Sequence, residues 1–278
     1  MITNHLKKAW SVVTAVAIGG AAMSHAQAAE SSRLDSWIAR WTNSSGAKIG
    51  WHKFQPNEIL VKHEKNFLGE SKKHTVLVPL CGKSVDLTYM ADHGHTVVGV
   101  EGVKEAIEMF SDESGESLLL DNYNNWFLGH GTRATGALAI VNGDYLTQTE
   151  EDMKLLLKTI NPQIDCSNGA FARVWDRASL VAIEPSDRQK YAEVTSSLMQ
   201  DGGKMLLCTF EYDSTKRSGP PYSVPLDEVT RLYAPHGMTI EVLERRRAPE
   251  NQGTLKVLGN ELFSCQFLLT KEKTTNEL

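Results

Sequence analysis

The sequence has few cysteines, and their spacing does not bring them together. Its 278 residues include four, Cys81, Cys166, Cys208 and Cys265, with no C-x-x-C pair among them. This low density excludes a small disulfide-stapled scaffold and a cysteine-based zinc site, and the nine histidines show no ligand spacing either. Cys208 and Cys265 lie in apolar, strand-like runs, which favours buried and reduced thiols. We therefore expect no metal centre.

Concentrated positive charge is missing as well. The formal net charge is −5, and apart from residues 245–247 the basic residues are scattered along the chain. Binding to a phosphate backbone needs a positive face, so we expect no nucleic-acid partner. No heptad seam demands a dimer, and we expect a monomer.

A long apolar run is also absent, although the N-terminus looks like a secretory leader. Two lysines precede an apolar stretch over residues 9–23, and Ala26-Gln27-Ala28 forms an A-x-A cleavage site. The stretch is too short and too interrupted by glycine to favour a stable membrane span. We assign residues 1–29 to a leader and residues 30–278 to a single domain, because about 250 residues suit one α/β domain.

Buried strands and helices alternate through the centre of the chain. Residues 75–79 (TVLVP) and 96–100 (TVVGV) are apolar runs typical of strands buried on both faces, and the segment 83–93 between them predicts a helix. Such a unit requires parallel strands joined by a right-handed crossover. Similar patterns predict further strands over 138–142, 171–175 and 204–212, and helices over 34–41, 57–67, 186–200 and 226–233.

The last two strand-like runs follow a different pattern. Residues 239–243 and 262–270 are joined by a polar loop without a helix, so this pair should be antiparallel. We expect an α/β Rossmann-like three-layer sandwich, with a mostly parallel seven-stranded sheet and an antiparallel strand near the C-terminus. That arrangement is typical of a methyltransferase core rather than of a dinucleotide dehydrogenase.

The segment VPLCGKSVD, residues 78–86, carries the strongest local signal. It joins the first buried strand to its helix, and ligands of open α/β sheets bind beyond the carboxyl ends of the strands. Gly82 allows close approach of the backbone, and the helix start offers unpaired N–H groups. The segment has neither G-x-G-x-x-G nor the Walker A spacing, which disfavours a dinucleotide or a triphosphate.

Polar residues follow the next strands at the same expected edge. Glu101 ends the second strand, where a carboxylate can accept hydrogen bonds from ribose hydroxyls, unless it is a solvated helix-start acid. Asp144 and Tyr145 follow the third strand, where a carboxylate can bind an exocyclic amine and a ring can lie along adenine. The alternative is that Asn142-Gly143 forms a simple hairpin turn.

Asp176 and Arg177 follow the fourth buried strand. They could form only a surface ion pair, worth less than about 1 kcal/mol. Their position above the expected site favours a binding role instead.

Three longer stretches share order and separation with one protein family: PLCGKSVDLTYMADHGHTVVGVE, WDRASLVAIEPSDRQKYAE and YDSTKRSGPPYSVPLDEVTRLY. The chain resembles the thiopurine S-methyltransferase family from about Leu34 to Glu272. The resemblance implies a cytoplasmic class I methyltransferase that uses S-adenosylmethionine. Its acceptor would be the sulfur of a thiopurine or another aromatic or heterocyclic thiol.

The resemblance also implies roles for individual residues. Trp37 and Trp41 would belong to an N-terminal segment that folds over the cofactor, and Arg177 would act on both the cofactor and the acceptor. The resemblance says least about substrate preference. The loop before Trp51 is longer than in vertebrate members of the family. Lys256 is the one candidate near the position of their second acceptor-side arginine. The complete set is cofactor contacts at Trp37, Trp41, Leu80, Glu101, Asp144, Tyr145 and Arg177, and an acceptor contact at Trp51.

Methyl transfer from a sulfonium to a thiolate removes charge from both partners, so an enzyme mainly has to position them and exclude water. We expect Arg177 to be the catalytic residue that favours the acceptor anion, while Trp51 packs against the acceptor ring. No metal is required.

Other functions remain open from the sequence. The acceptor could be another thiol or a selenium- or sulfide-type anion. A hydrolase or redox enzyme could use Cys81 with His93 or His95, although both histidines lie at the far end of the helix from Cys81. The leader favours export, and with it a non-catalytic, secreted cofactor-binding protein.

Overall fold

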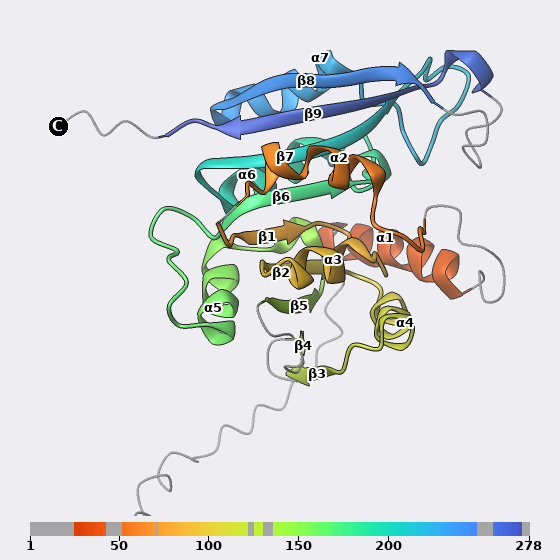
Figure 1. The fold of residues 1–278 in the computed structure, drawn as a ribbon. Coiled ribbons are helices and arrows are strands. Elements are labelled where there is room, and N and C mark those ends of the chain that lie inside the picture. Colours follow the sequence, from red (N-terminus) through yellow and green to blue (C-terminus); the bar gives the residue numbers. More distant parts are fainter. Residues whose placement is uncertain are drawn as a thin grey trace, which may run out of the picture.

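The computed structural model describes residues 25–42, 52–70, 72–121, 125–129, 136–248 and 258–273. Within these residues the chain forms one mixed sheet of nine strands in the order β3-β4-β5-β2-β1-β6-β7-β9-β8. Helices cover both faces of the sheet (Figure 1). The expected α/β sandwich of three layers is confirmed.

Five parallel strands form the centre of the sheet, and their apolar runs are buried as the sequence predicts. β1 and β2 pair in register from Thr75 with Thr96 to Val78 with Gly99. Each face of these strands packs against helices, which explains why their runs are continuous rather than alternating. The five are β5 (Ala137–Asn142), β2 (Thr96–Glu101), β1 (Thr75–Val78), β6 (Phe171–Arg177) and β7 (Met199–Glu211).

The C-terminal strands are antiparallel, as their connecting loop indicates. β9 (Phe263–Lys271) lies between β7 and β8 (Met238–Arg247) and runs antiparallel to both. The antiparallel strand near the C-terminus is therefore confirmed.

The expected number of seven strands was wrong. β3 (Leu118–Asp121) and β4 (Trp126–Gly129) form an antiparallel hairpin that extends the sheet beyond β5. Each has only four residues, and the leucine run of β3 shows no alternation that would separate strand from helix.

Two separate apolar cores lie on the two faces of the sheet. Asn57 caps the first helix of one face, because its side chain accepts a hydrogen bond from the Ile59 N–H at 2.9 Å, as expected. On that face lie α2 (Glu58–Phe67), α3 (Asp86–Asp92) and α4 (Lys104–Ser114); on the other lie α5 (Glu150–Ile160), α6 (Arg188–Leu198) and α7 (Leu226–Tyr233), with short helices η1 (Tyr145–Thr147), η2 (Leu180–Ala182) and η3 (Ala234–His236) in connections.

The N-terminal helix α1 (His25–Thr42) packs against α4 (Figure 1). It is longer than the expected 34–41 and begins inside the segment assigned to the leader. Trp41 is buried with Val103 and Ala106 in a small apolar cluster. None of the described helices combines the length and apolarity needed to cross a membrane.

Candidate active site

Four parallel strands end side by side at one edge of the sheet. β5, β2, β1 and β6 are consecutive neighbours, and their carboxyl ends lead directly to Asp144, Glu101, Leu80 and Arg177. The carboxyl ends of these neighbouring strands lie at one edge of the sheet (Figure 1), and the structure therefore brings the four residues together although they are far apart in sequence.

The turn after β1 has unusual backbone conformations. Leu80 has φ 43° and Gly82 has φ 52°, and this left-handed region costs a non-glycine residue about 1–2 kcal/mol. The Cys81 N–H donates to the Val100 carbonyl oxygen at 3.0 Å, which ties the turn to β2. In proteins, strained backbone conformations that the surrounding structure maintains occur mostly at ligand-binding and active sites.

The turn after β6 is strained as well and is attached to the first. Ala178 has φ 68°, and the Ser179 hydroxyl donates to the Pro79 carbonyl oxygen at 2.7 Å. The two turns thus support each other across neighbouring strands.

The Glu101 carboxylate bridges the turns that follow β1 and β2. It accepts from the Gly82 N–H and from the Val103 N–H, each at 2.8 Å. Burial raises the pKa of this carboxyl, while the backbone N–H groups of Val103, Gly82 and Gly102 act in the opposite direction. The side chain is 6% exposed, so the alternative of a solvated acid is wrong. A carboxylate has about four lone-pair sites, which leaves capacity for at least one hydroxyl donor.

The end of β5 is bonded to the end of β2. The Glu101 carbonyl oxygen accepts from the Gly143 N–H and from Asn142 Nδ2, both at 3.0 Å. Asp144 Oδ1 accepts from the Leu146 N–H at 2.9 Å and thereby caps η1. The chain therefore continues into a helix here, and the hairpin alternative for Asn142-Gly143 is wrong.

The Tyr145 ring is directed into the core. It is 1% exposed, its hydroxyl is 2.9 Å from Thr195 Oγ1, and its ring centroid is 4.9 Å from that of Tyr191. We expected this ring to lie along adenine, but the structure places it beneath the edge, where it supports the backbone of η1.

Asp176 and Arg177 point to opposite faces of the sheet. Asp176 is fully buried and accepts from the Tyr191 hydroxyl at 2.7 Å and the Leu180 N–H at 3.2 Å. Arg177 lies on the other face, where Asp86 and Cys208 are its electrostatic neighbours, and burial lowers its pKa. The alternative of a surface ion pair between them is therefore wrong.

Helix α1 covers the turns after β1 and β2. A Cβ atom on Gly82 would lie 2.9 Å from Trp41 Cζ2, and one on Gly102 would lie 2.5 Å from Leu34 Cδ2. Trp37 is half-buried next to this contact, with the Arg40 guanidinium 4.9 Å from its ring centroid. Trp51, the expected acceptor contact, lies outside the described residues.

These features fit an adenosyl sulfonium. The turn after β1 offers a glycine backbone, Glu101 and Asp144 offer carboxylate oxygens, and the tryptophans of α1 offer rings of the kind that bind cations. In the described part of the chain, no group of three or more His, Cys, Asp or Glu side chains could hold a metal ion.

Residues 32–272 match the protein family described as thiopurine S-methyltransferase (TPMT). The chain belongs to the TPMT family. It is thus an S-adenosylmethionine-dependent methyltransferase, and the predicted family, enzyme class and cofactor are confirmed.

Relatives of this TPMT-family chain occur in mammals and in bacteria. The thiopurine S-methyltransferase of Rattus norvegicus is 31% identical over 240 residues, 86% of this chain and 92% of the relative. That of Methylococcus capsulatus is 32% identical over 225 residues, 81% and 91% of the two chains. That of Bos taurus is 34% identical over 200 residues, 72% and 75%.

Solved structures share the fold at low sequence identity. Haemonchus contortus phosphoethanolamine N-methyltransferase 2 superimposes with a TM-score of 0.56 at 14% identity, over 87% of this chain and 59% of that one. A protein from the conversion of a disulfide into a thioacetal in echinomycin biosynthesis gives 0.55 at 17% identity, over 87% and 94%.

The cysteine-based rival does not fit this TPMT-family chain. Cys81 is buried, and desolvation together with Glu101 raises its pKa well above the ordinary thiol value. His95 is buried beside His74, whose N–H donates to His95 Nδ1 at 3.1 Å. His93 lies at the far end of α3. A protonated thiol without a nearby base cannot act as the nucleophile.

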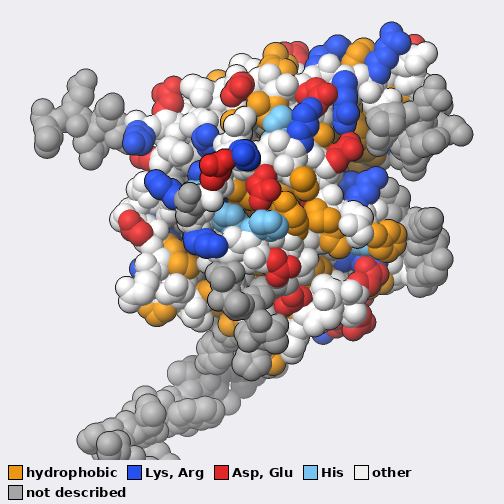
Figure 2. Space-filling model, in the orientation of Figure 1, with side chains coloured by type: hydrophobic (Ala, Val, Ile, Leu, Met, Phe, Trp, Pro, Cys, Tyr) orange, Lys and Arg blue, Asp and Glu red, His pale blue; other side chains and the backbone are white. Residues whose placement is uncertain are grey.

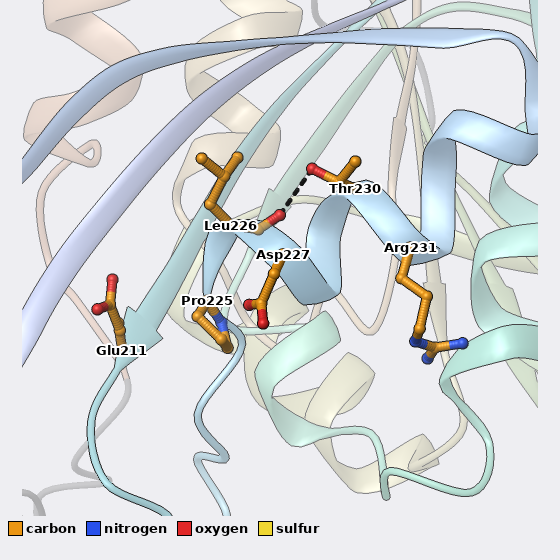
Figure 3. A pocket seen from close by; sticks show the side chains of 6 residues that line it. All are labelled: Glu211, Pro225, Leu226, Asp227, Thr230 and Arg231. Carbon is orange, nitrogen blue, oxygen red and sulfur yellow. Dashed lines mark hydrogen bonds between the residues drawn. The ribbon is translucent and has the colours of Figure 1, made fainter.

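Two open grooves lie near the end of β7, one strand beyond Arg177. The first is lined by Pro225, Leu226 and the side chains around them, with Glu211 and Asp227 facing it from either side (Figure 3). The second extends past Asp213 and Glu261. Their carboxylates would repel a thiolate, so we do not assign the acceptor to these grooves.

Sequence reasoning missed three charged or titratable side chains near the site. Lys83 is buried and forms an ion pair with Glu113 at the end of α4. His52 is also buried, with Nε2 at 3.4 Å from Glu113 Oε2. Elsewhere on the molecule, acidic and basic side chains are interspersed over the face that Figure 2 shows.

Proposed function

We propose that this TPMT-family enzyme methylates the sulfur of a thiopurine or a similar heterocyclic thiol. Family membership supports a sulfur acceptor, since the relatives are thiopurine S-methyltransferases. The single observation that carries the proposal is the position of Arg177. It is a half-buried cation at the end of β6, on the face of the sheet that also carries Asp86, and β6 is adjacent to the strand whose turn meets Glu101.

The remaining site residues then bind, orient and exclude water. The turn at Leu80 and Gly82, with Glu101 and Asp144, holds the cofactor, and α1 covers it. Bound S-adenosylmethionine supplies a methyl group on a positively charged sulfur. Arg177 stabilises the acceptor anion, and Trp51 keeps the role that the family resemblance implies for it, contact with the acceptor ring.

Arg177 is the variant position that tests this function. Loss of a charge-assisted contact costs about 1.5–3 kcal/mol, so Arg177→Ala should lower kcat/KM for a thiopurine by about 10- to 100-fold. Arg177→Lys should recover part of that loss, because it keeps the charge but not the planar fork. The measurement is transfer of a radiolabelled methyl group from S-adenosylmethionine.

A matched control is Arg231→Ala, since Arg231 is exposed on α7 and lines the acidic groove. It should leave kcat/KM unchanged. Equal activity of Arg177→Ala and the native enzyme would contradict the role of Arg177. Methyl transfer to selenium- or sulfide-type anions but not to any aromatic thiol would mean that the alternative acceptor class is the right one. Binding of the cofactor without any methyl transfer would support a non-catalytic binding protein.

We also propose that the enzyme acts in the cytoplasm, as a monomer. The described helix α1 begins at His25, so cleavage after Ala28 would remove the start of this helix. Mass spectrometry of the native N-terminus tests this proposal, because a retained Met1 is expected in the cytoplasm and cleavage after Ala28 is expected on export.

A further inference from the structure

Asp86 is a buried carboxylate whose two oxygens meet donors from distant segments. Its side chain is 2% exposed. Oδ1 accepts from the Asn57 backbone N–H at 2.7 Å, and Oδ2 accepts from the Trp175 indole Nε1–H at 2.9 Å. Hydrogen bonds to an ionised acceptor are stronger than those between neutral groups. A single side chain therefore joins the start of α3 to the start of α2 and to β6.

The carboxylate of Asp86 does not cap its own helix. An acidic side chain in the first turn of a helix commonly accepts from the free N–H groups there or interacts with the helix dipole. Asp86 is the first residue of α3, but its own N–H donates to Ser84 Oγ at 3.3 Å. Its two oxygens are directed at Asn57 and Trp175, which are 29 and 89 positions away in sequence. Contacts between elements therefore account for this carboxylate.

The contact with Asn57 fixes the segment from His52 to Asn57, which leads into α2. The Asn57 side chain caps α2, while its backbone N–H bonds to Asp86. At the other end of the segment, the His52 ring lies 3.4 Å from Glu113, which forms an ion pair with Lys83. Lys83 and Asp86 both follow the turn that binds the cofactor. Both ends of the segment are therefore held beside that turn.

The contact with Trp175 leads to Arg177. Trp175 is 1% exposed, and Arg177 is two positions further along β6. Successive side chains of a strand alternate between its faces, so these two lie on the same face. Trp175 packs there in one apolar core with Leu87 of α3. The bond from Asp86 to the indole therefore attaches the end of β6, and with it Arg177, to the start of α3.

We propose that Asp86 is a positioning residue that fixes the acceptor side of the site, both the segment from His52 to Asn57 and the Arg177 end of β6, against the turn that binds the cofactor. This proposal rests on the function proposed above, in which Arg177 and Trp51 contact the acceptor. Asp86 acts through these groups and is assigned to neither ligand. A misplacement of about 1 Å can cost about 10²-fold in rate, so acceptor kinetics should report the loss of Asp86.

Asp86→Asn separates this role from a general loss of structure. An asparagine side chain has one oxygen that accepts and an NH₂ group that donates. It can therefore accept from only one of the two N–H groups and directs a donor at the other. We expect KM for 6-mercaptopurine to rise about tenfold, while KM for S-adenosylmethionine stays within about threefold of the native value. Steady-state transfer of a radiolabelled methyl group measures both constants.

Removal of the second donor should rescue Asp86→Asn. Trp175→Phe keeps an aromatic ring but lacks the indole N–H, and by itself it should raise KM for mercaptopurine by no more than about threefold. In Asp86→Asn/Trp175→Phe the asparagine oxygen can accept from Asn57, and the NH₂ group no longer faces a donor. The double variant should therefore return to the level of Trp175→Phe. Two substitutions that only destabilise the fold would not compensate each other in this way.

Thr75→Val is the matched control, because Thr75 also joins two elements from a buried position, at the opposite end of β1. Its hydroxyl donates to the Ala170 carbonyl oxygen and accepts from the Ala172 N–H, each at 3.0 Å. Thr75→Val should lower Tm and leave both KM values unchanged. Calorimetry with S-adenosylhomocysteine checks that every variant is folded. Asp86→Glu, which displaces the carboxylate by one methylene, replaces Asp86→Asn if the latter fails that check, with the same expected split between the two KM values.

A second readout needs no turnover. The Trp175 indole N–H signal in the NMR spectrum, identified by its loss in Trp175→Phe, should lie at low field because it donates to a carboxylate, and it should move upfield in Asp86→Asn. A signal that does not move would overturn the proposal.

The kinetic outcomes distinguish this proposal from the proposed function. In Asp86→Asn, equal rises of the two KM values, or no rise in either, would overturn the positioning role and leave the proposed function intact. A double variant no better than Asp86→Asn would do the same. A native enzyme that methylates no thiol would overturn both.

Discussion

At the scale of single residues, Asp176 is a buried carboxyl that stabilises a turn instead of meeting a ligand. It accepts from the Leu180 N–H, which fixes the start of η2, and from the Tyr191 hydroxyl of α6. Burial raises its pKa from the ordinary 3.8 to about 6. Because Arg177 is the next residue in the chain, the geometry that Asp176 imposes also determines where Arg177 is anchored.

The raised pKa of Asp176 predicts a pH-dependent stability. Between pH 3.8 and about 6 the folded protein binds more protons at Asp176 than the unfolded chain does. The contribution of Asp176 to the free energy of unfolding is therefore fully present at low pH and is lost as the pH rises through about 6. The shift corresponds to about 3 kcal/mol in the free energy of unfolding.

Urea unfolding from pH 4 to pH 7 measures this effect. The free energy of unfolding of the native protein should fall by about 2 kcal/mol relative to that of Asp176→Asn over this range. Asp112→Asn, on the exposed side of α4, should follow the native protein at every pH. Parallel curves for the native protein and Asp176→Asn would contradict the prediction.

At the scale of elements, the contact of α1 with two glycines determines how the cofactor site is covered. Gly82 has positive φ and faces the rigid ring of buried Trp41. Gly102 faces Leu34 Cδ2, the end of a flexible side chain. Both glycines therefore lie against α1, but they differ in what an added methyl group would displace.

Gly82→Ala should destabilise the protein by about 1–3 kcal/mol, because alanine at positive φ is strained and its Cβ displaces Trp41. It should also weaken binding of S-adenosylhomocysteine. Gly102→Ala is the comparison, since Leu34 can change rotamer, and it should cost less than about 1 kcal/mol. Thermal unfolding and calorimetry measure both effects. Equal losses of stability for the two variants would show that the contact between Trp41 and Gly82 has no special effect on stability.

At the scale of the whole molecule, the cofactor site joins segments from the entire first two-thirds of the chain. Residues of α1, the β1 turn, the ends of β2 and β5 and the end of β6 meet at one edge. A ligand bound there contacts segments that are separate in the unfolded chain. It should therefore stabilise the fold as a unit.

S-adenosylhomocysteine at 100 times its Kd should add about 2.7 kcal/mol and raise Tm by about 5–11 °C. Glu101→Gln should weaken binding about tenfold, so at the same ligand concentration the rise in Tm should be smaller by about 3–6 °C. Glu108→Gln, on the exposed side of α4, is the control and should keep the full rise. An unchanged rise for Glu101→Gln would mean that its carboxylate does not contact the ligand. Differential scanning calorimetry measures all three proteins.

The central strands, their order along the chain and the residues at their carboxyl ends could all be predicted from the amino-acid sequence. It also determined α7, which spans Leu226–Tyr233 as predicted, and the cap of α2 at Asn57. These are local properties, since apolar runs, turn residues and capping side chains act over a few positions. Parallel pairing then follows, because a strand-helix-strand unit has one favoured handedness.

Which neighbours each of these residues meets depends on how the elements pack in the folded protein. Tyr145 and Asp176 follow strands as expected of site residues, but packing against α6 turns both side chains into the core. The β3-β4 hairpin forms because an existing sheet edge at β5 stabilises four-residue strands that would not persist alone. His52, Lys83 and Glu113 come together from three distant segments, and contacts across such distances depend on the packing of the whole fold, which no local pattern specifies.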